Sequence, residues 1–261
     1  MPAHPKPVVN STAYWDQRFR DDWEDRDGPG QTRFFAEQAV AAMPDWFVQE
    51  IRMRRLSIFD FGCAFGDALP VLRRAFPEAV IRGGDVARGA IATARERHPG
   101  FEFVVLDNDA PKLCANVVFC SNTIEHFADW RTKLAMLVTL ASDYVVTIAP
   151  FRERSLSSEH EAYFAYKTFV PVPGEPSRLD HLRIIDLRSI ENTRWHGRQW
   201  LGIWSKAAER RSVRSSTAFS PDDLDLRGRT SAEVGALLAA ANESDTENEA
   251  ARTEIAPENH P

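Results

Sequence analysis

Two acidic residues and two glycines mark the stretch of this chain whose residue types and spacing could do chemistry. Asp60 lies near the end of a short apolar run, Gly62 and Gly66 follow as a turn, and Asp85 comes nineteen positions after Gly66. Glycine has no side chain, so the backbone can approach a ligand closely at such a turn. A carboxylate at Asp85 can accept charge-assisted hydrogen bonds from both hydroxyls of a ribose. The spacing therefore predicts a nucleoside site. The alternative is a plain strand–helix turn with Asp85 as a cap.

Ala64 and Asp67 bear on which nucleoside this turn could hold. A dinucleotide places its pyrophosphate on a helix N-terminus, and the usual pattern there has three glycines. Here Ala64 takes the middle position, and the Asp67 carboxylate would repel a pyrophosphate. A ligand with a cationic end is less disfavoured. S-adenosylmethionine fits, because it combines adenine and ribose with a sulfonium and with an ammonium that attracts carboxylates such as Asp60.

Alternating strands and helices position these residues. Strands are expected at 57–61, 79–86, 101–106, 116–121 and 143–149, and helices at 31–43, 67–76, 88–97 and 128–140. This alternation indicates a parallel sheet covered by helices on both faces. Two later strands, 181–187 and 199–205, follow each other without a helix and should pair antiparallel. The predicted fold class is therefore a three-layer α/β/α domain. Its seven-stranded, mostly parallel sheet ends in a C-terminal antiparallel hairpin, and ligands bind at the carboxyl ends of its parallel strands.

The chain divides into three zones. Residues 1–12 are rich in proline and are expected to form a flexible arm. Residues 13–205 carry the periodic apolar pattern of the predicted domain, and 13–50 would form capping helices. Residues 206–261 are expected to form a basic linker and then an acidic, largely disordered tail.

The acidic tail carries more than the whole net charge. From Pro221 onward ten acidic residues face three arginines, a balance of −7, whereas the whole chain carries −6. One short helix, at 231–241, is expected within this tail. The basic piece 206–214 lies beside these acids and is more typical of a solvated linker than of a nucleic-acid contact.

Composition argues against several classes of protein. A net charge of −6 over 261 residues is not that of a general nucleic-acid or membrane-surface binder. No apolar run approaches the ~18 residues of a transmembrane helix, and the first residues lack the apolar core of a secretory signal. The three cysteines lack metal-ligand spacing and indicate reduced thiols. We therefore expect a cytoplasmic protein without nucleic-acid or membrane partners.

Four sequence motifs, taken in order, resemble those of the class I S-adenosylmethionine-dependent methyltransferases. They are DFGCAFGDAL, GGDVARGAI, FVVLDND and VVFCSNTIEHF, and the resemblance covers roughly residues 13–205. It implies a Rossmann-like methyltransferase fold, S-adenosylmethionine as cofactor and transfer of a one-carbon group. The family pattern has three alternating glycines after the acid, and Ala64 departs from it. The closing segment, TRWHGRQWLGIWSK, is similar to a bacterial subset linked to glycan and secondary-metabolite pathways.

The resemblance implies a role for each strand end. The turn from Gly62 to Gly66 would back the methionine part of the cofactor, Asp85 would hold the ribose, and the 107–108 pair would recognise adenine. An aromatic segment from Tyr14 to Phe19 would fold over the cofactor. The predicted cofactor-binding set is Tyr14, Trp15, Asp60, Gly62, Cys63, Ala64, Gly66, Asp85, Val86, Asp107, Asn108, Ser121 and Asn122.

Glu125, His126 and His160 are the candidate catalytic residues. Methyl transfer is an in-line displacement, in which the enzyme mainly positions the nucleophile and the methyl group. A hydroxyl acceptor also gains from a general base. His126 follows the fourth strand and His160 the fifth, so either histidine could face the acceptor as that base. Two alternatives remain open. His126 could be a structural cap, or the three side chains could hold a divalent metal, although their spacing is not diagnostic and no metal is assigned.

The predicted function is methyl transfer from S-adenosylmethionine to a small molecule, with O-methylation of a sugar or related hydroxyl as the favoured reaction. One alternative is an N- or protein methyltransferase of the same fold. The other is a non-catalytic S-adenosylmethionine-binding regulatory or scaffold protein, whose acidic tail would serve a partner. The Tyr163 and Lys167 spacing is shared with short-chain dehydrogenases, but the N-terminal glycine motif of those enzymes is absent from this sequence.

Overall fold

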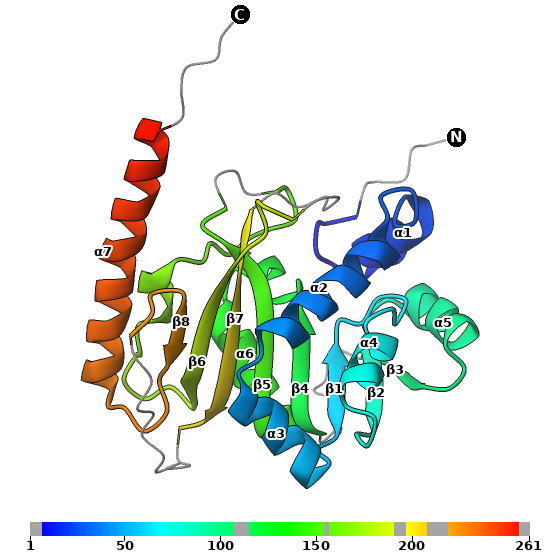
Figure 1. Ribbon diagram of the computed structural model, residues 1–261. Coiled ribbons are helices and arrows are strands. Elements are labelled where there is room, and N and C mark those ends of the chain that lie inside the picture. The colour runs from blue at the N-terminus through cyan, green and yellow to red at the C-terminus, as the bar shows by residue number, and fades with distance from the viewer. Residues whose placement is uncertain (1–6, 107–114, 154–156, 191–196, 208–218, 256–261) are drawn as a thin grey trace, which may run out of the picture.

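The computed structural model describes residues 7–106, 115–153, 157–190, 197–207 and 219–255, which form one eight-stranded sheet with helices packed on it (Figure 1). The strands are β1 (Ile58–Phe61), β2 (Ile81–Asp85), β3 (Glu102–Val105), β4 (Ala115–Ser121), β5 (Ala141–Phe151), β6 (Ser177–Asp186), β7 (Arg198–Lys206) and β8 (Asp223–Asp225). The α-helices are α1 (Thr12–Asp21), α2 (Gly28–Ala42), α3 (Asp45–Arg54), α4 (Leu69–Ala75), α5 (Arg88–Arg97), α6 (Trp130–Leu140) and α7 (Ser231–Ile255). Two short 3-10 helices are η1 (Ile124–His126) and η2 (Tyr166–Phe169).

The strand order is β3-β2-β1-β4-β5-β7-β6-β8. The first five strands in this order pair in parallel, while β7 pairs antiparallel with both β5 and β6. The predicted mostly parallel sheet with a C-terminal antiparallel hairpin is confirmed, and β8 adds an eighth strand beside β6. The chain leaves β1 toward β2 on one side and later returns to β4 on the other. The order therefore reverses at β1, which is where open α/β sheets bind ligands.

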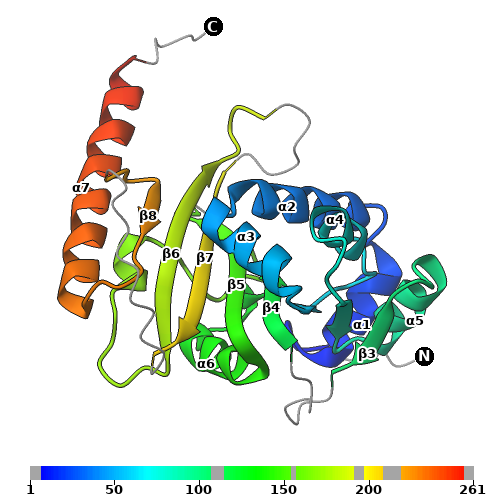
Figure 2. The ribbon, with the colours of Figure 1, turned by 60° about the horizontal axis from the view of Figure 1, so that its bottom comes forward.

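Successive strand residues face opposite sides of the sheet and build two cores. Ile58 and Val117 pack with α2, α3, α4 and α5 on one face. Their neighbours Phe59 and Val118 pack with α6 and α7 on the other face. Figure 2 shows α3 and α6 on opposite sides of the strands. Because both faces are covered, the strands read as continuous apolar runs rather than alternating ones.

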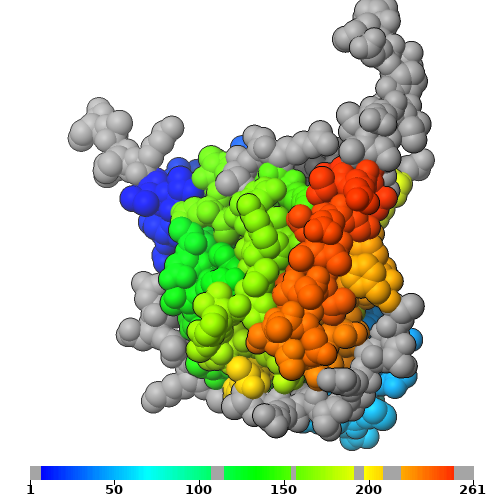
Figure 3. Space-filling view, turned by 90° about the vertical axis from the view of Figure 1, so that its left-hand side faces the viewer, coloured from blue at the N-terminus to red at the C-terminus, as the bar shows by residue number. Residues whose placement is uncertain are grey.

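The prediction of a short helix at 231–241 within a disordered tail is wrong for residues 219–255. The helix α7 runs from Ser231 to Ile255 and lies along the side of the molecule, beyond β8 (Figures 1 and 3). Val234, Leu238 and Ala241 lie on one helical stripe and are buried in the core. Asp245 continues that stripe by one turn, so the acidic half of the helix also faces the protein.

Ion pairs of Asp245 fix the acidic half of α7 against the sheet. The Asp245 carboxylate is 6% exposed and hydrogen-bonds to Arg198, which is 7% exposed. Its other oxygen lies 2.8 Å from Arg152, as an ion pair without hydrogen-bond alignment. Glu249, one turn further, also pairs with Arg198, at 3.0 Å. The acids of this helix thus neutralise two arginines of the sheet.

Replacing Asp245 with alanine should lower the free energy of unfolding by about 1.5–3 kcal/mol, because the buried Arg198 loses its closest counter-charge and keeps, among the described residues, only Glu249. The change is measured by urea denaturation. Glu247→Ala is the matched control, since Glu247 is exposed on the same helix. Equal stability of the two variants would show that the ion pairs of Asp245 with Arg198 and Arg152 contribute nothing to the fold.

The N-terminal arm is anchored at its last residues. Asn10, within the expected flexible arm, donates hydrogen bonds to the carbonyls of His126 and Glu159 and to the carboxylate of Glu161. Residues 1–6 lie outside the described ranges. Cys63 and Cys120 are buried free thiols. Within the described ranges, no helix combines the length and the apolar character that crossing a membrane requires.

Candidate active site

The glycine turn after β1 is shaped by three left-handed residues. Gly62, Ala64 and Gly66 have φ values of +79°, +48° and +80°. A Cβ on Gly62 would come within 2.5 Å of the Thr123 side chain, so glycine is required there by packing as well as by backbone conformation. Ala64 tolerates the left-handed region at a cost of about 1–2 kcal/mol, which is the physical meaning of its departure from glycine.

Asp85 is fixed at the carboxyl end of β2. Its two carboxylate oxygens accept hydrogen bonds from the amides of Ala64 and Ala87, each at 2.9 Å. Burial raises the pKa of Asp85 to about 6, while the amides of Ala87 and Ala64 act in the opposite direction. The group is therefore ionised at neutral pH and held in one orientation beside the glycine turn. Val86, the next residue, is partly buried against the core.

Asp60 is the second buried carboxyl group beside the glycine turn. It is 2% exposed, and the charge that acts on it is the like charge of Asp85. Burial, with a further contribution from the negative charge of Asp85, raises its pKa to about 8. Two buried carboxyl groups at the reversal point of the sheet favour a ligand that brings positive charge and hydroxyl donors. S-adenosylmethionine is such a ligand, because it carries a sulfonium, an ammonium and two ribose hydroxyls.

Helix α1 lies across this edge of the sheet. Asp16 accepts a hydrogen bond from the Gly89 amide at 3.2 Å, and the Trp15 ring lies 4.8 Å from the His126 ring. Tyr14 donates a hydrogen bond to Glu159. The aromatic segment thus connects the first turn of α5 to η1 and to the described residues after β5.

A second group of side chains gathers beyond the end of β4. Glu125, His126 and His160 each offer one ligand atom, and these atoms lie within 4.8 Å of one another. Glu125 is buried in η1, and its carbonyl accepts hydrogen bonds from the amides of Glu161 and Ala162 at 2.8 and 3.0 Å. These two bonds bring the 157–162 loop back against η1. The three predicted catalytic residues therefore lie together although the chain separates them.

Both histidines of this cluster are oriented through Nδ1. His126 Nδ1 lies 2.8 Å from the Glu159 carbonyl oxygen, which can only accept, so Nδ1 carries a hydrogen. His160 Nδ1 lies 2.6 Å from a carboxylate oxygen of Glu153. Burial lowers the pKa of His160, but the hydrogen bond to Glu153 and the charge of Glu125 outweigh it and leave the pKa raised. Burial raises the pKa of Glu125, against the opposing effect of the two histidines.

Comparison with known proteins gives partial sequence matches. No protein-family model matches the chain. Over 119 residues it is 33% identical to a malonyl-[acyl-carrier protein] O-methyltransferase of Acetivibrio thermocellus, covering 44% of this chain and 41% of that protein. Over 83 residues it is 32% identical to a trans-aconitate 2-methyltransferase of an Acidovorax species, covering 31% of this chain and 32% of that protein. The chain thus spans less than half the length of these curated relatives.

Similarity to solved structures extends over most of the chain. Magnesium protoporphyrin IX methyltransferase of Synechocystis, solved with S-adenosylmethionine, superposes with a TM-score of 0.56 at 14% identity, over 78% of this chain and all of that one. A chain of the complex between the Haloferax volcanii Trm112 methyltransferase activator and a methyltransferase gives a TM-score of 0.55 at 15% identity, over 77% and 99% of the two chains. The fold is that of the class I methyltransferases. The resemblance predicted from the four motifs is confirmed at this level.

The other predicted cofactor residues that the structure describes lie at the carboxyl ends of the parallel strands, as Asp60 and Asp85 do. Ser121 ends β4, and the Asn122 amide donates to the Ile148 carbonyl at 2.8 Å. Asn122 has a φ of +45° and its side chain donates to the Ser121 hydroxyl at 3.4 Å. Cys63 is 1% exposed and burial raises its pKa, so it is an inert packing residue. The predicted adenine residues, Asp107 and Asn108, lie outside the described ranges.

Asp67 does not act as the sequence predicts. Its carboxylate pairs with Arg33 at 2.9 Å and is 5% exposed, so its charge is largely neutralised within the protein. Asp67 therefore gives only a weak argument against a bound pyrophosphate. The preference for a cationic ligand depends instead on Asp60 and Asp85.

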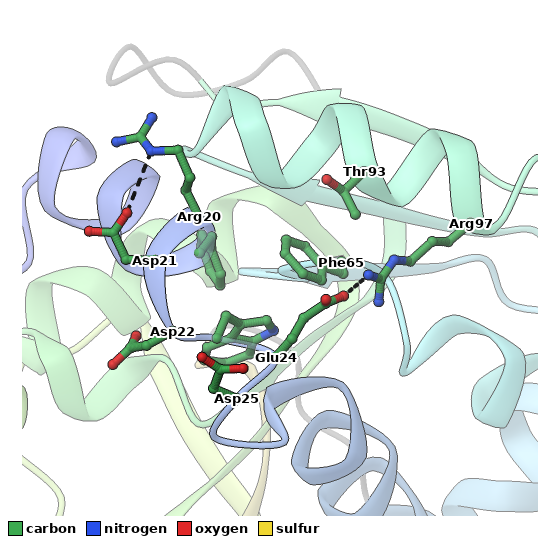
Figure 4. Close-up of a pocket in the computed structure, with 10 residues that line it drawn as sticks. Arg20, Asp21, Asp22, Glu24, Asp25, Phe65, Thr93 and Arg97 are labelled. Atoms are coloured by element: carbon green, nitrogen blue, oxygen red, sulfur yellow. Dashed lines mark ion pairs between the residues drawn. The ribbon is translucent and has the colours of Figure 1, made fainter.

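A cavity of about 330 Å³ opens beside the glycine turn but shares none of the predicted site residues. It lies between the end of α1, the following turn and α5 (Figure 4). Arg97 spans it, pairing with Glu24 and lying 4.8 Å over the Phe65 ring. The carboxylates of Asp21, Asp22 and Asp25 line the rest. Asp60 and Asp85 do not line this charged cavity, although Phe65 of the glycine turn and Phe19 of α1 do.

Sequence reasoning missed the residues that hold the histidine cluster. Glu153 and Glu159 orient the two imidazoles, and Glu159 also accepts hydrogen bonds from Tyr14 and Arg18. The acids that flank His160 in the sequence, Glu159 and Glu161, gave no usable signal, because Glu153 orients His160 and Glu159 orients His126 through its backbone carbonyl. Nor does anything in the sequence indicate that α1 is the partner of Glu159.

Proposed function

We propose that this protein transfers the methyl group of S-adenosylmethionine to a small-molecule acceptor. The observation that carries the proposal is the pair of buried carboxyl groups, Asp60 and Asp85, at the reversal point of the sheet. The partial relatives add support, since their names describe methylation of malonyl-[acyl-carrier protein] and of trans-aconitate. The net charge of −6 favours a small molecule over a nucleic acid as acceptor.

The cofactor would be bound along the edge from β4 to β2. Asp85 would accept from the ribose hydroxyls with the acceptor capacity that the amides of Ala64, Ala87 and Val86 leave on its carboxylate. Asp60 would meet the positive charge of the methionine end, with the Gly62–Gly66 backbone, Ser121 and Asn122 around it. Tyr14 and Trp15 on α1 would cover the cofactor. S-adenosylmethionine supplies the electrophilic methyl group.

The acceptor would lie toward Glu125, His126 and His160, and we propose a hydroxyl of a sugar or a related metabolite. A neutral His126 keeps its hydrogen on Nδ1, which leaves Nε2 free to accept the hydroxyl proton. The oxygen lone pair then forms the new bond to carbon as the carbon–sulfur bond breaks. The products are the methyl ether and S-adenosylhomocysteine. A base-bearing cluster beside the acceptor favours this reaction over simple cofactor binding.

Product detection tests the reaction directly. The protein is incubated with S-adenosylmethionine carrying a deuterated methyl group and with pools of sugars and small metabolites, and labelled products are sought by mass spectrometry. We expect a product methylated on oxygen and one molecule of S-adenosylhomocysteine for each methyl group transferred. Labelled amines or protein side chains would instead favour an N- or protein methyltransferase. Tight cofactor binding without any transfer would favour a non-catalytic binding protein.

His126→Gln should lower kcat for the identified acceptor by about 10²–10⁴-fold, the usual contribution of a general base. His160→Gln should also lower it, because His160 shares the cluster. Cofactor affinity, measured by calorimetry, should stay within a factor of about two for both variants, since neither side chain lies at the Asp60–Asp85 pair. Unchanged turnover in both variants would remove the two histidines from the mechanism.

A further inference from the structure

We propose that Glu125, His126 and His160 together bind one divalent transition-metal ion, such as Zn²⁺, whose open coordination position receives an oxygen of the acceptor. The ion's role in catalysis rests on the proposed function, whereas its binding can be measured without any methyl transfer. No metal is assigned to this cluster by the sequence or by the comparisons.

The ligand types and their spacing suit such an ion. Two imidazoles and one carboxylate are the set found in catalytic zinc sites and in other open transition-metal sites. The three ligand atoms lie within 4.8 Å of one another. Around an ion with bonds of about 2.1 Å, tetrahedral ligands lie about 3.4 Å apart. The most distant pair of ligand atoms therefore has to close by up to roughly 1.4 Å around a bound ion.

The hydrogen bonds behind the two imidazoles are those that metal-binding histidines use. A ligating histidine typically donates its second ring N–H to a carbonyl or carboxylate, which fixes the ring and makes the other nitrogen a better ligand. His126 Nδ1 meets the Glu159 carbonyl at 2.8 Å. His160 Nδ1 meets the Glu153 carboxylate at 2.6 Å. Both rings are thereby fixed in orientation, as the rings of metal-binding histidines are.

Glu125 supplies an observation independent of the histidines. It is 1% exposed, and its Oε2 atom is buried with no hydrogen-bond partner among the described residues. An unpaired carboxylate oxygen in such surroundings is costly, and a cation removes that cost. Glu153 and Glu159 add negative charge around the same cluster. The buried oxygen, the two oriented imidazoles and the surrounding acids all favour a bound cation.

The cluster is also close to the proposed cofactor site. Asp60 on β1 pairs in register with Phe119 on β4, and η1, which carries Glu125 and His126, directly follows β4. An oxygen bound at this ion would thus lie on the acceptor side of the cofactor. The ion would lower the pKa of an acceptor hydroxyl, so that its proton can leave to solvent before the oxygen attacks the methyl carbon. In that state His126 acts as a ligand, and the general-base route describes the ion-free cluster.

Metal binding to the chelator-stripped protein tests the proposal. Co²⁺ is titrated as a spectroscopic probe, and Zn²⁺ affinity is measured by competition with a chromogenic chelator. We expect one ion per chain and visible Co²⁺ absorption bands typical of mixed nitrogen and oxygen ligands. Glu125→Gln and His160→Gln should each weaken binding by at least about 100-fold, and Glu153→Gln by about 10–100-fold.

Glu161→Gln is the matched control, because Glu161 is exposed and adjacent to His160 but is not part of the cluster. It should bind metal like the wild type. Asp85→Asn should also keep its metal affinity while losing cofactor affinity, which separates failure of the metal site from failure of the proposed function. Thermal melting checks that each variant is folded. The proposal is overturned if the wild type binds no stoichiometric ion, or if a folded Glu125→Gln variant binds as tightly as the wild type.

Discussion

Replacing Asp85 with alanine should weaken the binding of S-adenosylmethionine by at least about 100-fold. The variant loses two hydrogen bonds from the ribose to a charged acceptor, each contributing about 1.5–3 kcal/mol, and 1.4 kcal/mol corresponds to a factor of ten. Asp85 is suited to this role because burial and the Ala64 and Ala87 amides fix its orientation. The measurement is calorimetric titration with S-adenosylmethionine and S-adenosylhomocysteine.

The same substitution also has a structural effect, which must be measured separately. Removing the carboxylate leaves the buried amides of Ala64 and Ala87 without acceptors, at about 1–3 kcal/mol each. Asp85→Asn is the matched variant, because its amide oxygen can still accept from one of them. We expect it to fold better than the alanine variant yet to bind the cofactor much more weakly than the wild type. If a folded Asp85→Ala variant binds S-adenosylmethionine as tightly as the wild type, Asp85 does not bind the ribose.

Replacing Asp60 with asparagine should stabilise the cofactor-free protein increasingly as the pH rises. The pKa of Asp60 is about 8 in the folded protein, against an ordinary value of 3.8. Between these values the folded state holds a proton that the unfolded state has lost, so this group's contribution to stability falls as pH increases. Asparagine does not titrate. The stability difference should therefore grow from pH 4 to pH 8 and then level off, reaching a few kcal/mol, since one pKa unit is about 1.4 kcal/mol.

The experiment compares urea denaturation of the wild type and of Asp60→Asn at several pH values. A difference that stays constant with pH would mean that Asp60 is ionised in the cofactor-free protein.

Proton release on cofactor binding provides a second test of the ionisation state of Asp60. If the positive charge of the cofactor ionises Asp60, then binding near pH 7 releases a proton from the wild type but not from the variant. Calorimetry in buffers of different ionisation enthalpy detects that proton, because the buffer takes it up and the measured heat of binding changes accordingly.

Sequence reasoning found the central sheet and the carboxylate pair because both are local signals. Apolar runs identify strands that are buried on both faces, and Asp60 and Asp85 lie at or near the ends of two such runs. Parallel pairing then brings adjacent strand ends together. The same reasoning failed for α7, because its acidic half is stabilised by Arg152 and Arg198, which lie far away in the sequence. Without those partners the acids indicate disorder.

The histidine cluster was predictable only in part. The sequence placed His126 after the fourth strand and His160 after the fifth, on the same edge of the sheet. It gave no path for the described residues between Phe151 and Ala165, which are 152–153 and 157–164. In the structure the Arg152 amide donates to the Phe164 carbonyl at 2.8 Å, which closes this segment and returns His160 to Glu125. The closure depends on backbone hydrogen bonds that no side-chain pattern reports.

Calorimetric titration of the purified wild-type protein tests most directly the claim that this sheet edge binds S-adenosylmethionine. S-adenosylmethionine, S-adenosylhomocysteine and NAD⁺ are titrated in parallel, because the Arg33 pairing of Asp67 leaves a dinucleotide as the relevant competitor. We expect one site per chain for S-adenosylmethionine and for S-adenosylhomocysteine, with Kd values on the order of 1–100 μM, and no measurable binding of NAD⁺. Tighter binding of NAD⁺, or no heat from S-adenosylmethionine at millimolar concentration, would contradict this claim.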